Sequence, residues 1–353
     1  MRKQFQPSQF NGCKVLVIGD LMIDEYWWGE VERISPEAPV PVVSVLEEAF
    51  TLGGAGNVIN NLVALGANVF AAGVIGTGQD GDILIEKFKA LGLETQGIVR
   101  VQDRPTTRKT RIIASNQHIV RIDRESKSSI SIETAEKLAD YISNKIKESD
   151  IVVISDYAKG VLTPDLLKHI IFSINESGKI GIADPKGLDY TKYSGLTLIT
   201  PNKKEAALAS RIDIVDESSL IQAAEVLSNK LQIPRILITC GKDGMMLWQE
   251  NTPPCMIQSQ ARQVYDVSGA GDTVISVLSL CLATGMSFEE SAIIANVAAG
   301  IVVGKLGTAT ITSKELSDAL NPSIDVLFKN NLRQLKNLVI NTILKPTRDS
   351  GDN

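Results

Sequence analysis

The chain has 353 residues, of which 44% are hydrophobic and 22% are charged, and its formal net charge is -5 at pH 7. A chain of this length can bury a large core as one domain, or as one domain with an inserted subdomain. A chain with this net negative charge has no excess of basic residues to form a phosphate-binding surface, which argues against a nucleic-acid partner.

The N-terminal extension, residues 1–12, is polar and lacks the apolar core of a signal peptide. No apolar run approaches the roughly 20 residues of a membrane span. The cysteines include no C-x-x-C pair, which argues against a zinc site and is typical of free thiols in a reducing compartment. His118 and His169 are the only histidines, so a histidine triad is nearly excluded. We therefore expect a cytoplasmic protein without a membrane partner.

Apolar runs that each end in polar residues predict buried parallel strands, because they are continuous rather than alternating. These runs lie at residues 15–18, 151–154, 180–183, 196–199 and 236–238. The intervening segments, such as 132–146 and 220–231, are long enough for crossover helices. The sequence therefore predicts an α/β fold with a doubly wound, mainly parallel sheet flanked by helices. Ligands bind beyond the carboxyl ends of the strands in such sheets.

Two stretches, at about residues 25–51 and 97–123, interrupt this alternation. Both are rich in Val, Ile, Thr and Arg without a helical period, and Pro36, Pro39 and Pro41 exclude a helix from the first. We interpret both stretches as extended strands of a small β-sheet that stands off the main domain.

A turn of small residues that ends in a carboxylate occupies residues 266–273 and leads into an apolar stretch. A helix that begins at Gly269, Ala270 and Gly271 would direct backbone N–H groups and the positive end of its dipole toward a phosphoryl group. Asp272 would then lie one residue inside this anion hole, where it could take a proton from an attacking hydroxyl. The alternative interpretation is an ordinary Gly-rich helix start.

Four signatures in this order resemble those of the ribokinase/PfkB family of carbohydrate kinases, over about residues 12–315. They are GGAGN at 53–57, TPNKKE at 200–205, TCGKDG at 239–244 and DVSGAGDT at 266–273. The resemblance implies a ribokinase-like fold whose small sheet is a lid over the sugar and the interface of a homodimer. It also implies ATP and Mg²⁺ as cofactors and Asp272 as the catalytic base, whereas a dependence on a monovalent cation stays open.

Three further segments resemble the D-glycero-β-D-manno-heptose 7-phosphate kinases of that family. These segments are ISPEAPVPV at 34–42, SDYAKG at 155–160 and AGIVVGKLGTAT at 299–310. The resemblance implies transfer of a phosphoryl group to the anomeric hydroxyl of this sugar phosphate, on the route to the ADP-heptose of lipopolysaccharide core.

On the sugar side, the resemblance implies that Asp24 and Asn57 bind hydroxyl groups. Gly53 and Gly54 would let the backbone approach the sugar, or would merely form the turn into a helix. The phosphate that is not transferred requires cations, and arginine suits bidentate phosphate recognition. The candidates are Arg111, Lys159 and Lys186, with Arg104 and Arg121 less favoured. Two strand-end carboxylates complete the expected substrate-binding set, Asp156 and Asp184.

On the nucleotide side, the resemblance implies that Asn202 and Glu205 organise Mg²⁺, with Glu205 acting through water. The alternative is a plain helix N-terminus with no such role. Further residues would bind the phosphates and ribose, namely Thr239, Gly241 and Gly244. Residues on an apolar helix would form the adenine pocket, although periodicity alone would place them in the core, and they are Asn296, Ala299, Gly300 and Val303.

Rival interpretations remain. No Walker A pattern occurs, which disfavours a P-loop kinase. Another sugar kinase of the same family is the first alternative, and a non-catalytic sugar-phosphate-binding regulator is the second. The third is a bifunctional heptose enzyme, whose nucleotide-transferring domain carries an H-x-G-H motif. We expect the chain to end before such a domain, with a kinase domain at 13–320, a C-terminal helix at 321–344 and a disordered tail at 345–353.

Overall fold

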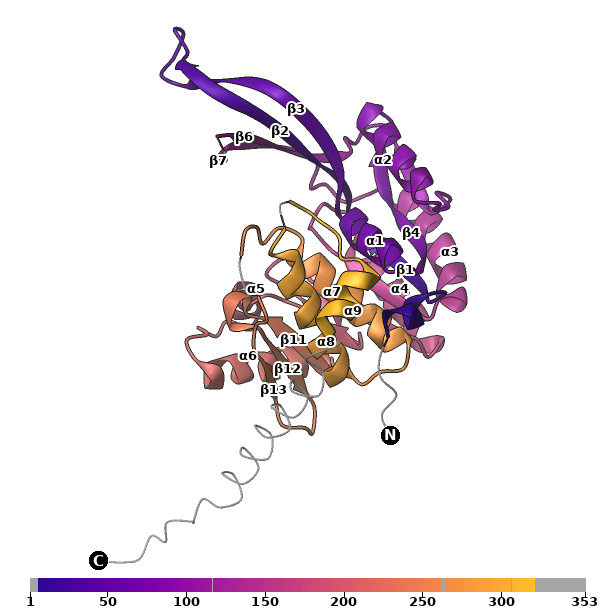
Figure 1. Ribbon diagram of the computed structural model, residues 1–353. Helices are drawn as coiled ribbons and strands as arrows, with labels where there is room; N and C mark the ends of the chain where they lie inside the picture. The colour runs from indigo at the N-terminus through magenta and orange to yellow at the C-terminus, as the bar shows by residue number, and fades with distance from the viewer. Residues whose placement is uncertain (1–5, 116, 262–263, 306, 321–353) are drawn as a thin grey trace, which may run out of the picture.

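A computed structural model describes residues 6–115, 117–261, 264–305 and 307–320. A large sheet forms the centre of the molecule, with helices on both of its faces, and a smaller sheet projects from one end (Figure 1). The predicted C-terminal helix and tail lie outside the described residues.

The large sheet is parallel from β5 to β11 and antiparallel only at its β12 and β13 edge. All the predicted strand runs are present in it, and β8 is buried along its whole length, as expected for a central parallel strand. In spatial order the strands are β13 (Cys255–Ile257), β12 (Met245–Gln249), β11 (Arg235–Thr239), β10 (Leu198–Ile199), β9 (Ile180–Asp184), β8 (Ile151–Ser155), β1 (Lys14–Gly19), β4 (Asn68–Gly76) and β5 (Ile98–Val101).

Two separate hydrophobic cores lie on the two faces of this sheet, which confirms the doubly wound architecture. One face is covered by α1 (Ala55–Ala64), α2 (Gln79–Ala90), α7 (Ala270–Ala283), α8 (Phe288–Val302) and α9 (Ser313–Leu320). The other face is covered by α3 (Ile132–Glu148), α4 (Pro164–Glu176), α5 (Lys203–Ser210) and α6 (Glu217–Leu231). Within the described residues no helix is long and apolar enough to cross a membrane.

The small sheet, which we call the lid, has the strand order β3-β2-β6-β7. Its strands are β2 (Leu21–Ile34), β3 (Pro41–Gly54), β6 (Thr107–Ala114) and β7 (Gln117–Arg124). The long β2–β3 hairpin reaches well beyond the main body in Figure 1. This position follows from the sequence, because β2 continues almost directly from β1 and β3 runs directly into α1.

Two of the predicted boundaries differ from the structure. The second lid stretch was expected to begin at residue 97, but β5 pairs with β4 at the edge of the large sheet. Val and Ile favour either sheet, and only pairing decides between them. The N-terminal extension is not separate from the domain either, because a short 3₁₀ helix, Pro7–Phe10, buries Phe10 in the core.

Candidate active site

The N-terminus of α7 lies at the centre of the site and begins at the predicted small-residue turn. Gly269 is its N-cap residue and has a φ of 78°, in the left-handed region that favours glycine. A β-carbon at this position would lie 2.7 Å from Nδ2 of Asn57. The Ala270 N–H already donates to the Val267 carbonyl at 3.3 Å, so it is not a free donor of the predicted anion hole. Gly271 is exposed, with open space around it.

Asp272 lies in the first turn of α7 and is only 5% exposed. Its Oδ1 accepts a hydrogen bond from the Tyr157 hydroxyl at 2.6 Å, and its Oδ2 accepts one from Nδ2 of Asn57 at 2.7 Å. Burial raises the pKa of Asp272 to about 6, and these two hydrogen bonds oppose the rise by stabilising the charged form. The carboxylate is therefore ionised at neutral pH yet basic enough to accept a proton.

Asn57 and Tyr157 are the two side chains that hold the Asp272 carboxylate. Asn57, expected to bind sugar hydroxyls, is buried in α1 and directs its amide at Asp272. Its Oδ1 in turn accepts from Asn61. Tyr157 belongs to the SDYAKG segment, but residue type and spacing assigned it no role. The tertiary contact between β8 and α7 brings that segment to the α7 turn and places its hydroxyl on the carboxylate.

The sugar-side residues Asp24 and Arg111 form an ion pair between β2 and β6, with Nη1 of Arg111 2.7 Å from Oδ1 of Asp24. Asp24 is also one of the charged groups near Asp272. A β-carbon at Gly53 would lie 2.7 Å from Oδ2 of Asp24, so this glycine leaves room for that carboxylate. Gly54 is the N-cap residue of α1, which fits the alternative of a turn into a helix.

The cations expected at the second phosphate are distributed over different partners. Lys159 pairs with Glu125 at 2.5 Å, while Lys186 forms an ion pair with Glu205, on the nucleotide side. Arg104 donates to backbone carbonyls at its neighbouring loops, and Arg121 pairs with Asp123 within the lid. Each of these four cations therefore already has a partner within the fold.

Asp156 and Asp184, the two strand-end carboxylates, have different surroundings. Asp156 is buried, and its oxygens accept hydrogen bonds from Lys192, from Tyr193 and from the Ala158 backbone. Asp184 lies near the base, and its pKa is raised well above the usual range, first by burial and second by the charge of Asp272.

Lys109 of β6 is a site residue that the sequence reasoning missed. Its ammonium group lies 5.4 Å from the centre of the Tyr157 ring and is close enough to Asp272 to affect its pKa. Burial lowers the pKa of Lys109 itself. None of the described residues forms an ion pair with it, in contrast to Arg108 and Arg111 beside it. The sequence signal was a cation two positions before Arg111, on the same face of a strand.

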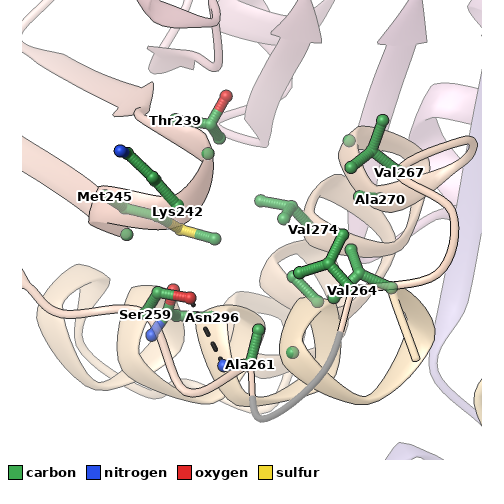
Figure 2. Close-up of a pocket in the computed structure, with 16 residues that line it drawn as sticks. Thr239, Lys242, Met245, Ser259, Ala261, Val264, Val267, Ala270, Val274 and Asn296 are labelled. Carbon is green, nitrogen blue, oxygen red and sulfur yellow. Dashed lines mark hydrogen bonds between the residues drawn. The ribbon is translucent and has the colours of Figure 1, made fainter.

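A pocket of about 250 Å³ lies on the other side of the α7 N-terminus. Figure 2 shows Thr239, Lys242 and Met245 on one wall and Val267, Ala270 and Val274 of the α7 segment on the other. Every residue expected at the nucleotide phosphates, ribose and adenine lines this pocket, namely Thr239, Gly241, Gly244, Asn296, Ala299, Gly300 and Val303.

The lining of this pocket has two chemical characters. The region near Val264, Val267 and Val274 is apolar. Val264 is 59% and Val267 69% exposed to solvent, so both side chains are available to contact a flat base. Lys242 adds a cation beside the Gly241 turn, and sequence reasoning had assigned it no role. Its place in the TCGKDG segment was the available signal.

Asn202 and Glu205 form a reciprocal capping box at the start of α5. Oδ1 of Asn202 accepts from the Glu205 N–H at 2.9 Å, and Glu205 Oε2 accepts from the Asn202 N–H at 3.0 Å. Among the described residues there is no group of three or more His, Cys, Asp or Glu side chains that could hold a metal.

Comparison with known proteins agrees with this geometry. Residues 13–315 match the pattern of the pfkB family carbohydrate kinases. The chain is 53% identical over 334 residues to "Bifunctional protein HldE" of Desulfatibacillum aliphaticivorans, covering 95% of this chain and 68% of that protein. It is 49% identical over 334 residues to the protein of the same name from Geotalea uraniireducens, covering 93% and 68%. The chain thus spans about two thirds of these relatives.

Solved structures show the same fold. Arabidopsis thaliana ribokinase, complexed with ribose and ATP, superposes with a TM-score of 0.70 at 19% identity, over 88% of this chain and 100% of that one. Phosphofructokinase-2 from Escherichia coli gives 0.74 at 18% identity, over 88% and 98%. The ribokinase-like fold and the family inferred from the four signatures are therefore confirmed. The chain belongs to the pfkB family of carbohydrate kinases.

Proposed function

We propose that this kinase transfers the γ-phosphoryl group of ATP to the anomeric hydroxyl of D-glycero-β-D-manno-heptose 7-phosphate and forms the 1,7-bisphosphate, a step toward ADP-heptose. The observation that carries the proposal is the position of Asp272, between the apolar pocket and the charged lid residues. The three segments that resemble heptose 7-phosphate kinases and the similarity to the HldE proteins support the choice of sugar.

The chemistry follows from the residues around α7. Asp272 accepts the proton of the anomeric hydroxyl while its oxygen attacks the γ-phosphorus in line. The α7 N-terminus, with the open space at Gly271, faces the charge that develops on the transferring group. Mg²⁺, held by the ATP phosphates and by Glu205 through water, would neutralise part of that charge.

The apolar pocket holds the nucleotide in this proposal. Valine side chains would cover the adenine faces, while Thr239, Lys242 and Gly244 would bind the ribose and phosphates. The sugar would lie opposite, under the lid, where Asp24 and Asp184 accept hydrogen bonds from hydroxyl groups. Asp272 then separates the two ligands and touches the reacting oxygen of one of them.

Lys109 has the chemistry to bind the phosphate that is not transferred, because it is a half-buried cation whose charge no described carboxylate neutralises in an ion pair. Lys159 is a second cation close to Lys109 and would help it to bind the phosphate. Lys109→Met should raise KM for the sugar phosphate by about 10- to 100-fold, the loss of one charge-assisted contact. KM for ATP should change little, as measured by coupled kinetics.

Arg33→Met supplies the matched control for that variant. Arg33 is a cation on the exposed part of lid strand β2, so its loss removes a lid charge without touching the proposed pocket. Unphosphorylated heptose should be a poor substrate of the wild type. Lys109→Met should change kcat/KM for this sugar little. An unchanged KM for the sugar phosphate would remove Lys109 from the phosphate site.

A coupled ADP-release assay over a panel of sugars tests the proposed substrate. The panel should include heptose 7-phosphate, ribose, fructose 1-phosphate and a nucleoside, with the phosphorylated product identified by mass. We expect the highest kcat/KM with heptose 7-phosphate. Faster turnover of another sugar would assign the chain to a different kinase of the family, and binding without ADP release would indicate a regulator.

We also propose that the enzyme is a homodimer that pairs through its lid. Apolar side chains are exposed on lid strands, including Leu46 at 71% and Ile122 at 50%, and β3 and β7 are free edges of the sheet. Light scattering should give twice the chain mass of 38.1 kDa. Leu46→Asp should shift the protein toward the monomer, and a monomeric wild type would contradict the proposal.

A cytoplasmic location fits the chemistry of the cysteines. All four are free thiols in the structure, and two of them, Cys255 and Cys281, are buried. Buried free thiols persist in a reducing compartment. The ATP that the reaction consumes is a further reason to place the enzyme there.

A further inference from the structure

Asp272 is held by two donors that come from different parts of the fold. Tyr157, in the loop after β8, donates to Oδ1, and Asn57, in α1, donates to Oδ2. A carboxylate with both oxygens engaged cannot rotate freely, so the two donors fix the direction of its remaining lone pairs. The donor on Oδ1 is a hydroxyl whose proton is shared with no other described group.

The loop that carries Tyr157 is itself rigidly built. The Tyr157 N–H donates to Oδ2 of the buried Asp20 at 2.8 Å, and the Lys159 N–H donates to the same oxygen at 3.1 Å. Oδ1 of Asp156 accepts from the Ala158 N–H at 2.7 Å. The backbone that carries Tyr157 is therefore held by hydrogen bonds to buried carboxylates, and the hydrogen bond to Asp272 sets the direction of its side chain.

Other charged groups face Asp272 from the surrounding elements, but they act in opposite directions. Asp24 of β2 raises the pKa of Asp272, and Lys109 of β6 lowers it. Asp184, at the end of β9, is a further carboxylate in the cluster, beside Lys186. Among all the influences on Asp272, the Tyr157 hydrogen bond is the largest that opposes burial. Burial and the charge of Asp272 keep the pKa of Tyr157 well above its usual range, so its hydroxyl stays a donor.

We propose that Tyr157 is a positioning residue for phosphoryl transfer, which holds the Asp272 carboxylate toward the attacking hydroxyl and stabilises its ionised form by a hydrogen bond. This role rests on the proposed function, in which Asp272 is the base. Tyr157 transfers no proton and does not touch the transferred group. The chain thereby uses a residue of the SDYAKG segment to set the working pH range of a base on α7, far away in the sequence.

Tyr157→Phe removes only the donor. In the wild type, kcat/KM for the sugar phosphate should fall on the acid side with a midpoint near the pKa of Asp272, about 6. A hydrogen bond to a charged group is worth enough to move this midpoint upward by about one to two pH units in the variant. Activity at pH 7 should then fall by about 2- to 10-fold and recover at alkaline pH, because the base ionises there.

Tyr193→Phe is a closely matched control. The Tyr193 hydroxyl donates to Oδ2 of Asp156 at 2.6 Å, the same length as the bond from Tyr157 to Asp272. Removing it deletes an equivalent donor from a buried carboxylate that is not the base. The thermal midpoint should fall in this variant, while the pH midpoint of kcat/KM should stay at the wild-type value.

A second measurement needs no substrate. The stability lost on Tyr157→Phe is measured by urea unfolding at pH 8 and at pH 5, in the natural chain and in an Asp272→Asn background. In the natural chain Tyr157→Phe should cost more stability at pH 8, where Asp272 is ionised, than at pH 5. In the Asp272→Asn background it should cost the same stability at the two pH values. The unfolding measurement tests the role of Tyr157 even if the proposed sugar is wrong, because a wrong sugar affects only the kinetic measurement.

Several results would overturn the inference. A pH-independent loss of kcat/KM in Tyr157→Phe would indicate a structural role only, and an unmoved midpoint with a raised sugar KM would make Tyr157 a substrate contact. An equal stability loss at both pH values in the natural chain would show that the hydroxyl does not favour the ionised carboxylate.

Discussion

Asp272→Asn is expected to lower kcat by roughly 10²–10⁴-fold while ATP binding stays within a few-fold. The amide keeps the size of the side chain but cannot accept the proton. The remaining side-chain oxygen can take the place of Oδ2 and accept from Asn57, and the Tyr157 hydroxyl can rotate to accept from the new NH₂ group, so the local packing should survive. Single-turnover kinetics and nucleotide titration would measure the two effects separately. Near-normal turnover would exclude Asp272 as the essential base.

The same variant should change the pH dependence of stability in a defined direction. Burial raises the pKa of Asp272 from 3.8 to about 6. A raised pKa in the folded state means that the wild type loses stability as the pH rises through this range. Asn cannot ionise, so the variant should gain stability relative to the wild type between these pH values and keep the gain at neutral pH. If the stability of the variant relative to the wild type were lower at pH 7 than at pH 4, the assigned direction of the pKa shift would be wrong.

Gly269→Val should reduce kcat by roughly 10²-fold or more, because it disturbs the residue that holds the base. The backbone φ of 78° is strained for a β-branched residue, and the new β-carbon would lie 2.7 Å from Nδ2 of Asn57. Asn57 would then move away from Asp272 and leave the carboxylate misplaced. Coupled kinetics would measure kcat, and thermal unfolding would measure the accompanying loss of stability.

Gly178→Val separates backbone strain from that contact. Gly178 follows α4, has a φ of 61°, and a β-carbon there would meet no other atom within 4 Å. This variant should lose stability through strain alone and keep its kcat. If both variants lost kcat to the same extent, the contact between Gly269 and Asn57 would not be the cause.

The sequence by itself determined the type of fold and the family. Continuous apolar runs such as those of β1 and β8 are typical of buried parallel strands, because both faces of such a strand are covered. The turn at Gly269 and Asp272 identified the helix N-terminus and its carboxylate from adjacent residues. The residues expected at the nucleotide phosphates, ribose and adenine came from the family resemblance, and all of them line one pocket.

The tertiary structure alone decided which side chains meet. Tyr157 and Asn57 lie more than a hundred residues from Asp272, and no periodicity relates a tyrosine after one strand to a carboxylate on a distant helix. Lys186 and Glu205 pair for the same reason, across two neighbouring strand ends. The membership of β5 in the large sheet was also open, because Val and Ile favour any strand and only the partner fixes the sheet. Hydrogen bonds and ion pairs act over a few ångströms, and the folded chain sets those distances.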